Sequence, residues 1–138
     1  MSELSGRLMD KGHELVQRVY FEDTDFSGRV YHARYLHFLE RGRSDYLRLL
    51  GIHHRELAEE GLAFVVRRME IEFLSPAAID DELTIVSQPE RIGNASIVLR
   101  QSVVCEGRRL VSAEVKVALV DGAGRPARMP APVKLAFE

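Results

Sequence analysis

The stretch that decides the fold runs from Arg18 to Arg43 and reads RVYFEDTDFSGRVYHARYLHFLERGR. It begins with an apolar run typical of a strand, and residues 23–28 follow as a polar turn with two carboxylates and a glycine. It ends in an amphipathic segment typical of a helix. A carboxylate just before a helix N-terminus suits acyl chemistry, because the helix end holds negative charge and the carboxylate acts as base or nucleophile.

The helical pattern extends from Tyr31 to Leu50 and ends at Gly51, a natural stop signal. A helix of that length is roughly 30 Å long, enough to span a small domain. We therefore expect it to be the central helix against which a sheet packs. Gly42 within it costs about 1 kcal/mol relative to alanine, which a close approach of helix and sheet would explain. The expected buried face comprises Tyr31, Tyr35, Phe38, Leu39, Gly42, Tyr46, Leu49 and Leu50.

Strand patterns occur on both sides of this helix. A first strand is expected within His13 to Thr24, and residues 1–12 are expected to be a loose arm. After a short helix from His54 to Glu60, apolar and polar residues alternate in four further runs, at 68–76, 83–85, 94–105 and 110–120. The tail after them contains three prolines and is expected to be irregular.

Successive strands joined by short turns are antiparallel. The pattern predicts an α+β fold in a single domain over residues 1–138, with an antiparallel sheet of about five strands on one long helix. The helix covers one face of such a sheet. Pairing of two sheets edge to edge would give a dimer.

Composition excludes several classes of protein. The net charge is −2, from 19 basic and 21 acidic residues, which argues against a general nucleic-acid binder. No apolar run reaches the roughly 18 residues of a membrane span, and Met1 to Glu14 lacks the apolar region of a signal peptide, so we expect a cytoplasmic protein without a transmembrane segment. The single cysteine, Cys105, rules out an intrachain disulfide and is expected to be a buried structural thiol.

Asp25 is the first candidate for chemistry, because it lies in the turn before the helix. The backbone N–H groups near Tyr31 and His32 would bind the oxygen that gains charge, and Gly28 would let the backbone approach a ligand closely. A purely structural alternative stays open at this point. On spacing alone, residues 23–25 are better explained as a turn that caps the helix.

Glu40 lies two helical turns after His32 and could face the same side. On a helix, however, an ion pair with Arg41 or Arg43 is the favoured explanation. The histidines show no metal-ligand spacing, and we expect neither a metal nor another cofactor. The sequence has no phosphate-binding loop or serine elbow, and we expect no serine or cysteine nucleophile beside a histidine.

Arg67 and Arg68 form a basic pair near a strand start. Such a pair can hold phosphate, and the alternative is a solvated strand edge that limits sheet pairing. The residues by themselves favour the solvated edge.

The same stretch closely resembles the active-site signature of the 4-hydroxybenzoyl-CoA thioesterase family. The matching positions are Arg18-Val19, Thr24-Asp25, Gly28, Val30, His32 and Tyr35. Within that family the run from Val19 to Asp25, with Val30-Tyr31-His32, resembles the YbgC-type acyl-CoA thioesterases, which are linked to the bacterial Tol-Pal system. The similarity continues through residues 64–67, 73–77 and 80–81.

This resemblance implies a hotdog fold and hydrolysis of an acyl-CoA thioester to free acid and CoA. It implies that Asp25 is the catalytic carboxylate and that His32 or its neighbour Tyr31 polarises the carbonyl through a backbone N–H. Gly28, Val30 and Glu40 would then adjoin the substrate. A homodimer or tetramer is also implied, with CoA at the subunit interface.

Arg67 and Arg68 become candidates for the CoA phosphates under the same resemblance. Arg29 departs from the family pattern, where an apolar residue usually follows the glycine, so the acyl preference stays open. Two alternatives also stay open. One is a thioesterase acting on acyl carrier protein on the same fold. The other is a non-catalytic acyl- or CoA-binding protein, or an interaction protein associated with Tol-Pal.

Overall fold

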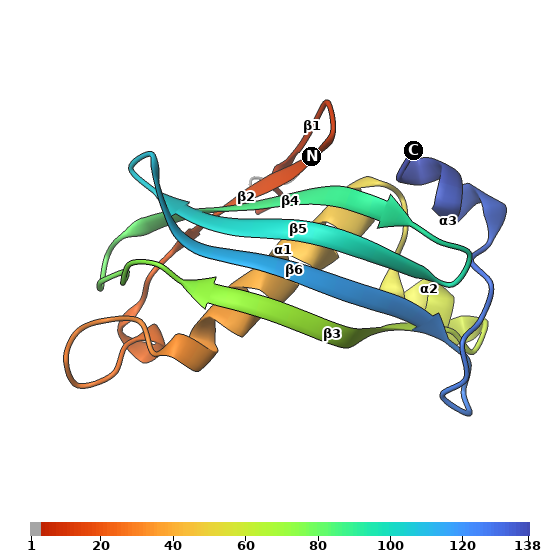
Figure 1. Cartoon of the computed structure of the whole chain (residues 1–138), viewed down its shortest axis with the longest axis horizontal. Coiled ribbons are helices and arrows are strands. Elements are labelled where there is room, and N and C mark those ends of the chain that lie inside the picture. Colours follow the sequence, from red (N-terminus) through yellow and green to blue (C-terminus); the bar gives the residue numbers. More distant parts are fainter. Residues whose placement is uncertain (1–3) are drawn as a thin grey trace.

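The computed structural model describes residues 4–138 and shows one antiparallel sheet with a long helix, α1, across one face (Figure 1). The six strands lie in the order β1-β2-β4-β5-β6-β3. The elements, with η for 3₁₀ turns, are β1 (Arg7–Met9), β2 (Gly12–Arg18), η1 (Phe21–Asp23), η2 (His32–Arg34), α1 (Tyr35–Leu49), α2 (His54–Glu59), β3 (Ala63–Phe73), β4 (Glu82–Ile92), β5 (Ser96–Cys105), β6 (Arg108–Val120) and α3 (Ala131–Ala136). The expected α+β architecture is confirmed, with one strand more than the five expected.

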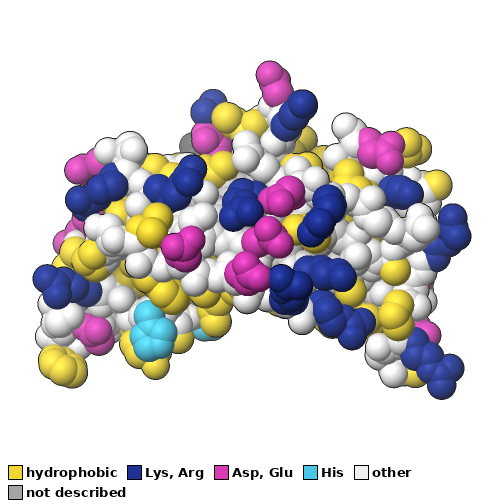
Figure 2. Space-filling model, viewed as in Figure 1, with side chains coloured by type: hydrophobic (Ala, Val, Ile, Leu, Met, Phe, Trp, Pro, Cys, Tyr) yellow, Lys and Arg dark blue, Asp and Glu magenta, His cyan; other side chains and the backbone are white. Residues whose placement is uncertain are grey.

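Side-chain alternation along the strands separates the two faces of the sheet, because successive residues of a strand point to opposite faces. In β6 the residues of one parity from Val111 to Leu119 are buried beneath α1, as the sequence predicts. The other face is rich in charge and is turned toward the viewer in Figure 2. There Arg100 forms ion pairs with Glu90 and Glu114. This face is polar, and the apolar core lies between the sheet and α1.

The N-terminal segment differs from expectation. Part of the segment expected to be a loose arm forms β1, which pairs with β2, and residues 1–3 lie outside the described part of the chain. The first strand ends at Arg18 and does not continue to Thr24. The physical reason is Asp23, whose carboxylate accepts the Tyr20 N–H at 2.8 Å and so stabilises the 3₁₀ turn η1.

The central helix also begins later than the sequence pattern suggests. The α-helix starts at Tyr35, after the 3₁₀ turn η2, and the expected start at Tyr31 is wrong. Two long-range hydrogen bonds keep the preceding backbone extended. The Val30 N–H donates to the Ala77 carbonyl at 2.9 Å, and the Tyr31 N–H donates to the Asp23 carbonyl at 3.1 Å.

The C-terminal tail is not wholly irregular, since it ends in the short helix α3. Pro130 and Pro132 stand at its cap and first turn, where a missing N–H costs nothing because that N–H has no intrahelical acceptor. Phe137, just after α3, contacts Tyr46 of α1 edge to face, with ring centroids 5.5 Å apart. The tail therefore closes the end of the core. No helix among residues 4–138 is long and apolar enough to cross a membrane.

Gly42 marks a close approach between α1 and the sheet, as its position in the helix suggested. A Cβ atom built on Gly42 would lie 2.7 Å from the Cγ2 atom of Ile85 in β4. Real Cβ atoms essentially never come that close, so any larger residue would force the helix and the sheet apart. The intrinsic helix preference of alanine cannot compensate for this clash.

We expect Gly42→Ala to lower the free energy of unfolding by about 1–3 kcal/mol, because overpacking a dense core forces backbone shifts. Urea denaturation followed by circular dichroism measures it. Gly122→Ala is the matched control, since a Cβ there meets nothing within 4 Å, and its effect should stay within about 0.5 kcal/mol. If Gly42→Ala were as stable as wild type, the close approach of helix and sheet would be incorrect.

Candidate active site

The loop between Thr24 and Val30 is a narrow hairpin at one end of the molecule (Figure 1). Thr24 and Val30 form an antiparallel bridge at its base. Inside it the Asp25 N–H donates to the Arg29 carbonyl at 2.9 Å, and the Gly28 N–H donates to the Asp25 carbonyl at 3.1 Å. Gly28 has a φ of 81°, a conformation that other residues adopt at a cost. Glycine is thus required here by the turn itself.

Contacts with the segment before β4 hold this hairpin in place. The Ile79 N–H donates to the Gly28 carbonyl at 3.1 Å, and Val30 is buried while bonded to Ala77. The Ala77 N–H in turn donates to the Tyr35 hydroxyl at 3.0 Å, at the first residue of α1. The hairpin and the start of α1 therefore share one support.

Asp25 lies at the solvent-exposed side of this hairpin. Its Oδ1 atom accepts the Ser27 N–H at 2.8 Å and also the Ser27 hydroxyl. The two Ser27 hydrogen bonds lower the pKa of the Asp25 carboxyl, and the Arg29 backbone and charge act in the same direction. The carboxyl is therefore ionised at neutral pH. Both Ser27 hydrogen bonds are made to the Oδ1 atom, and the Asp25 side chain remains exposed to solvent.

Asp23 stabilises the turn before the central helix, a role that the sequence left open for either Asp23 or Asp25. It is buried, and its Oδ1 lies 2.8 Å from the Arg34 Nε atom. Its Oδ2 accepts the Tyr20 N–H, and its backbone carbonyl accepts the Tyr31 N–H. Asp23 thus joins η1 to η2. The alternative in which these carboxylates only stabilise a turn before the helix therefore applies to Asp23, whereas, among residues 4–138, the Asp25 carboxylate bonds only within its own loop.

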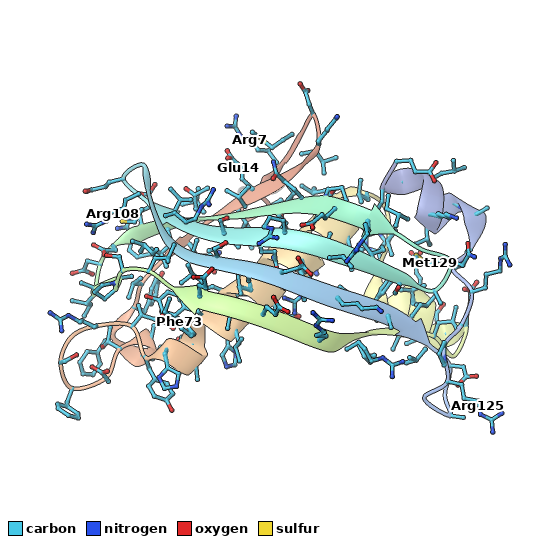
Figure 3. The ribbon with its side chains drawn as sticks, viewed as in Figure 1. Arg7, Glu14, Phe73, Arg108, Arg125 and Met129 are labelled. Atoms are coloured by element: carbon cyan, nitrogen blue, oxygen red, sulfur yellow. The ribbon has the colours of Figure 1, made fainter. Side chains whose placement is uncertain are left out.

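The two expected N–H donors differ in availability. The Tyr31 N–H is already bonded to Asp23, so this group is occupied. His32 begins η2, and the first N–H groups of a helical turn have no intrahelical acceptor. The His32 ring packs between Tyr31, at 4.7 Å between centroids, and Phe73 of β3, at 6.1 Å. Figure 3 places Phe73 beside this end of the molecule, so the hairpin, η2 and the end of β3 meet there.

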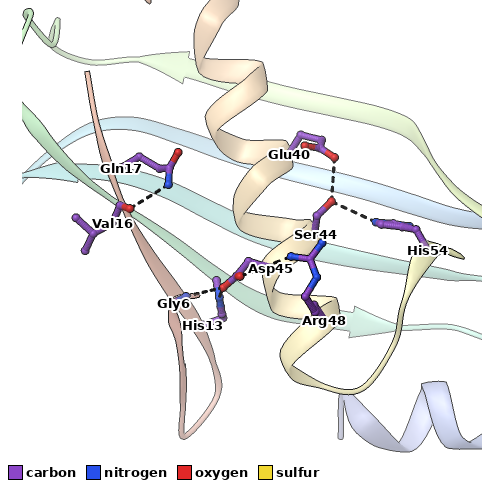
Figure 4. A network of polar contacts seen from close by, with 9 residues as sticks. All are labelled: Gly6, His13, Val16, Gln17, Glu40, Ser44, Asp45, Arg48 and His54. Atoms are coloured by element: carbon purple, nitrogen blue, oxygen red, sulfur yellow. Dashed lines mark hydrogen bonds and ion pairs between the residues drawn. The ribbon is translucent and has the colours of Figure 1, made fainter. Parts of the chain in front are cut away.

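Glu40 does not join this group. Its Oε1 accepts the Ser44 hydroxyl at 2.9 Å, and that hydroxyl lies 3.2 Å from His54 Nε2 (Figure 4). The expectation that no serine lies beside a histidine was wrong, because Gly51 ends α1 and the chain folds back along it. The ion pair of Glu40 with Arg41 or Arg43 is not found among the described residues.

Arg67 and Arg68 lie near the middle of β3, at a β-bulge. Arg68 pairs with Glu70 at 2.7 Å, and both side chains are exposed. Phe73 is five positions after Arg68 along the strand, a distance of roughly 17 Å. The basic pair is therefore at some distance from the Asp25 hairpin within one chain. No group of three or more His, Cys, Asp or Glu side chains suited to a metal ion is found in residues 4–138.

Sequence reasoning missed Ser27, whose two hydrogen bonds fix the Asp25 carboxylate. The signal was present, because a serine two residues after an aspartate in a turn is a common source of such bonds. It also missed the buried pair of His13 and Asp45, which are 32 residues apart in sequence. Nothing in the local pattern indicates that pairing.

Comparisons with known proteins agree with this fold. The model of the Thioesterase-like superfamily matches residues 19–137. The acyl-CoA thioesterase YbgC of Haemophilus influenzae is 43% identical over 132 residues, which cover 94% of this chain and 97% of that protein. The acyl-CoA thioester hydrolase YbgC of Escherichia coli O6:H1 is 44% identical over 105 residues, covering 75% and 78%. The crystal structure of a probable thioesterase from Bartonella henselae has a TM-score of 0.83 at 48% identity, covering 86% of this chain and 99% of that one.

Proposed function

We propose that Asp25 is the catalytic carboxylate of this chain, which belongs to the thioesterase-like superfamily. The chain has the hotdog fold and is an acyl-CoA thioesterase, which hydrolyses acyl-CoA to free acid and CoA. The observation that carries this proposal is the ionised Asp25 carboxylate, which Ser27 fixes at the Oδ1 atom and which is exposed to solvent. It stands in a hairpin braced against the first residue of α1.

Two routes use the same atoms. As a general base, Asp25 takes a proton from water while the water oxygen attacks the thioester carbon; the C–S bond then breaks and the CoA sulfur receives a proton. As a nucleophile, Asp25 attacks the carbon directly, CoA leaves, and water hydrolyses the mixed anhydride. In either route the His32 N–H is the proposed donor to the carbonyl oxygen. Such a donor is worth about 3 kcal/mol in known oxyanion holes.

Thiol release over a series of acyl-CoA esters, aliphatic and aromatic, tests the function. Turnover of at least one ester by wild type is expected. The same acyl groups attached to acyl carrier protein form the matched series. If only these carrier thioesters reacted, the substrate would be an acyl-carrier-protein thioester and not an acyl-CoA. Absence of turnover with both series would favour the non-catalytic binding protein.

Ser27→Ala should shift the pH profile of kcat/KM. The active form of Asp25 is the carboxylate, so the rate falls as the pH drops through its pKa. Ser27 holds that pKa below its ordinary value, chiefly through the hydroxyl that the alanine lacks. The acid limb should therefore move to higher pH in the variant, while the rate on the neutral plateau changes little. Circular dichroism at each pH separates this shift from acid unfolding, and an unshifted limb would exclude Asp25 as the titrating group.

A homodimer formed through β3 is part of the proposal. β3 has 11 residues and, among residues 4–138, pairs with β6 alone, so in this part of the chain its other edge carries unpaired backbone groups. The opposite edge of the sheet is β1, with three residues. A second copy pairing along β3 would extend the sheet and bring a second chain near Phe73 and the Asp25 hairpin. The Arg67 and Arg68 contact with CoA phosphates would then come from one or the other chain.

Val65→Lys should weaken this dimer at least about tenfold, because Val65 is an exposed apolar residue of β3 and a lysine there must be desolvated on association. Light scattering over a concentration series measures the change. Val16→Lys is the control, since Val16 is similarly exposed but lies on β2, which is at the side of the sheet away from β3. Equal effects of both substitutions, or none, would contradict assembly through β3. The expected cytoplasmic location stays a prediction, tested by cell fractionation.

A further inference from the structure

A cavity of about 150 Å³ lies between the middle of α1 and the sheet. Its floor is apolar, built from Phe64, Ile97, Leu99, Val117 and Phe137. None of the residues from Thr24 to His32 lines it. Its first helical residue, Glu40, lies five positions after the start of α1, or roughly 7 Å along the helix axis. This cavity is therefore separate from the Asp25 hairpin.

Arg43 lines this cavity and is the unusual group in it. The residue is only 9% exposed, and its Nη1 atom donates to the Gln101 Oε1 atom at 3.0 Å. Gln101 is neutral and also donates to the Leu39 carbonyl and the Ser87 hydroxyl, so its polar atoms are occupied. Within residues 4–138, Arg43 forms no ion pair, and no acceptor is found for its Nε and Nη2 atoms.

A largely buried cation without an ion-pair partner is costly, because the protein interior replaces little of the solvation that water gave it. Burial lowers the pKa of Arg43 and the nearby Glu40 opposes that change. The guanidinium nonetheless remains charged, as arginine does in proteins. Glu40 does not neutralise it by contact, since its carboxylate accepts a hydrogen bond from Ser44 at the mouth of the cavity (Figure 4). The site thus combines an apolar floor with a largely buried positive charge that has no ion-pair partner within residues 4–138.

We propose that this cavity binds a small organic monocarboxylate, with the carboxylate on the Nε and Nη2 donors of Arg43 and the apolar body on the floor. The planar guanidinium matches a carboxylate with two parallel hydrogen bonds. A cavity of this volume accommodates a group of about the size of benzene. Glu40 at the mouth carries the same charge as the ligand and limits its affinity. The inference does not depend on the catalytic role of Asp25.

Calorimetric titration with benzoate and its neutral analogue benzamide tests the proposal. Wild type should bind one benzoate per chain and benzamide at least about tenfold more weakly, the effect of one charged hydrogen-bonded contact. Arg43→Met should weaken benzoate by a similar factor. Arg41→Met is the matched control, because Arg41 is exposed on α1 and does not line the cavity, and its affinity should equal that of wild type.

Glu40→Gln gives a second measurement that does not depend on a buried substitution. Glu40 is exposed, and removing its charge should strengthen benzoate binding several-fold while leaving benzamide unchanged. Ring NMR signals of His54 at the cavity mouth should shift during the titration, and those of His32 should not. Equal binding of benzoate and benzamide, no binding, an unchanged affinity in Glu40→Gln, or shifts confined to His32 would each overturn the proposal.

Discussion

Asp25→Asn is expected to reduce kcat for acyl-CoA hydrolysis by about 10²- to 10⁴-fold, the usual contribution of a positioned acid–base group. The reason is chemical, because the amide neither accepts a proton from water nor attacks a thioester carbon. The fold should be preserved, since the asparagine Oδ1 atom can still accept the Ser27 N–H that the aspartate accepts at 2.8 Å. Steady-state thiol release, with the melting temperature measured alongside, separates the two effects.

Asp23→Asn is the matched control, two residues away in the same turn. Asp23 is buried and pairs with Arg34 at 2.8 Å, so its loss should lower the free energy of unfolding by roughly 1–3 kcal/mol. Its kcat, measured well below the melting temperature, should fall far less than that of Asp25→Asn. A variant with Asp25→Asn or Asp25→Ala that hydrolyses acyl-CoA at the wild-type rate would show that another group carries the reaction.

The sequence predicted the fold where local pattern and tertiary structure agree. One parity in β6, from Val111 to Leu119, is buried as expected, and Gly42 marks a close approach of helix and sheet. The boundaries failed where a distant partner decides the backbone. The extended backbone at Val30 depends on the carbonyl of Ala77, 47 residues further along the chain, and no pattern within the helical segment carries that information.

The site was predictable to the same extent. The hairpin and its carboxylate followed from composition, but Asp23 and Asp25 are equivalent in local spacing. The burial of Asp23 and its contact with Arg34 separate the structural carboxylate from the exposed carboxylate of Asp25. Glu40 illustrates the opposite error, because its helical position suggested a place near His32, whereas Ser44 and His54 determine where its carboxylate lies.

Asp45→Ala is expected to lower the free energy of unfolding by about 2–6 kcal/mol, because it leaves both the buried His13 ring and the Gly6 N–H without their acceptor, at about 1–3 kcal/mol each. His13 is fully buried, and its Nε2 atom lies 2.6 Å from the Asp45 Oδ2 atom (Figure 4). The same carboxylate oxygen accepts the Gly6 N–H at 2.8 Å. The pair thus joins the N-terminal hairpin of β1 and β2 to the C-terminal half of α1. Urea denaturation monitored by circular dichroism measures the loss.

The cost should be high because His13 has no second partner to compensate. Its Nδ1 atom is buried with no hydrogen bond among the described residues, and Tyr46 stacks against the ring with centroids 5.4 Å apart. Without Asp45 the Nε2 atom would also be buried and unpaired, which adds a cost of about 1–3 kcal/mol to that already present at Nδ1.

A double-mutant cycle distinguishes this pair from ordinary packing. The double variant His13→Leu/Asp45→Leu replaces both polar partners by apolar side chains. Its loss of unfolding free energy should therefore be smaller than the sum of the losses of the two single variants. Its kcat should remain close to that of wild type, because neither residue belongs to the Asp25 hairpin. If the two single effects simply add, or if Asp45→Ala costs less than about 1 kcal/mol, the pair does not hold the N-terminal hairpin to α1.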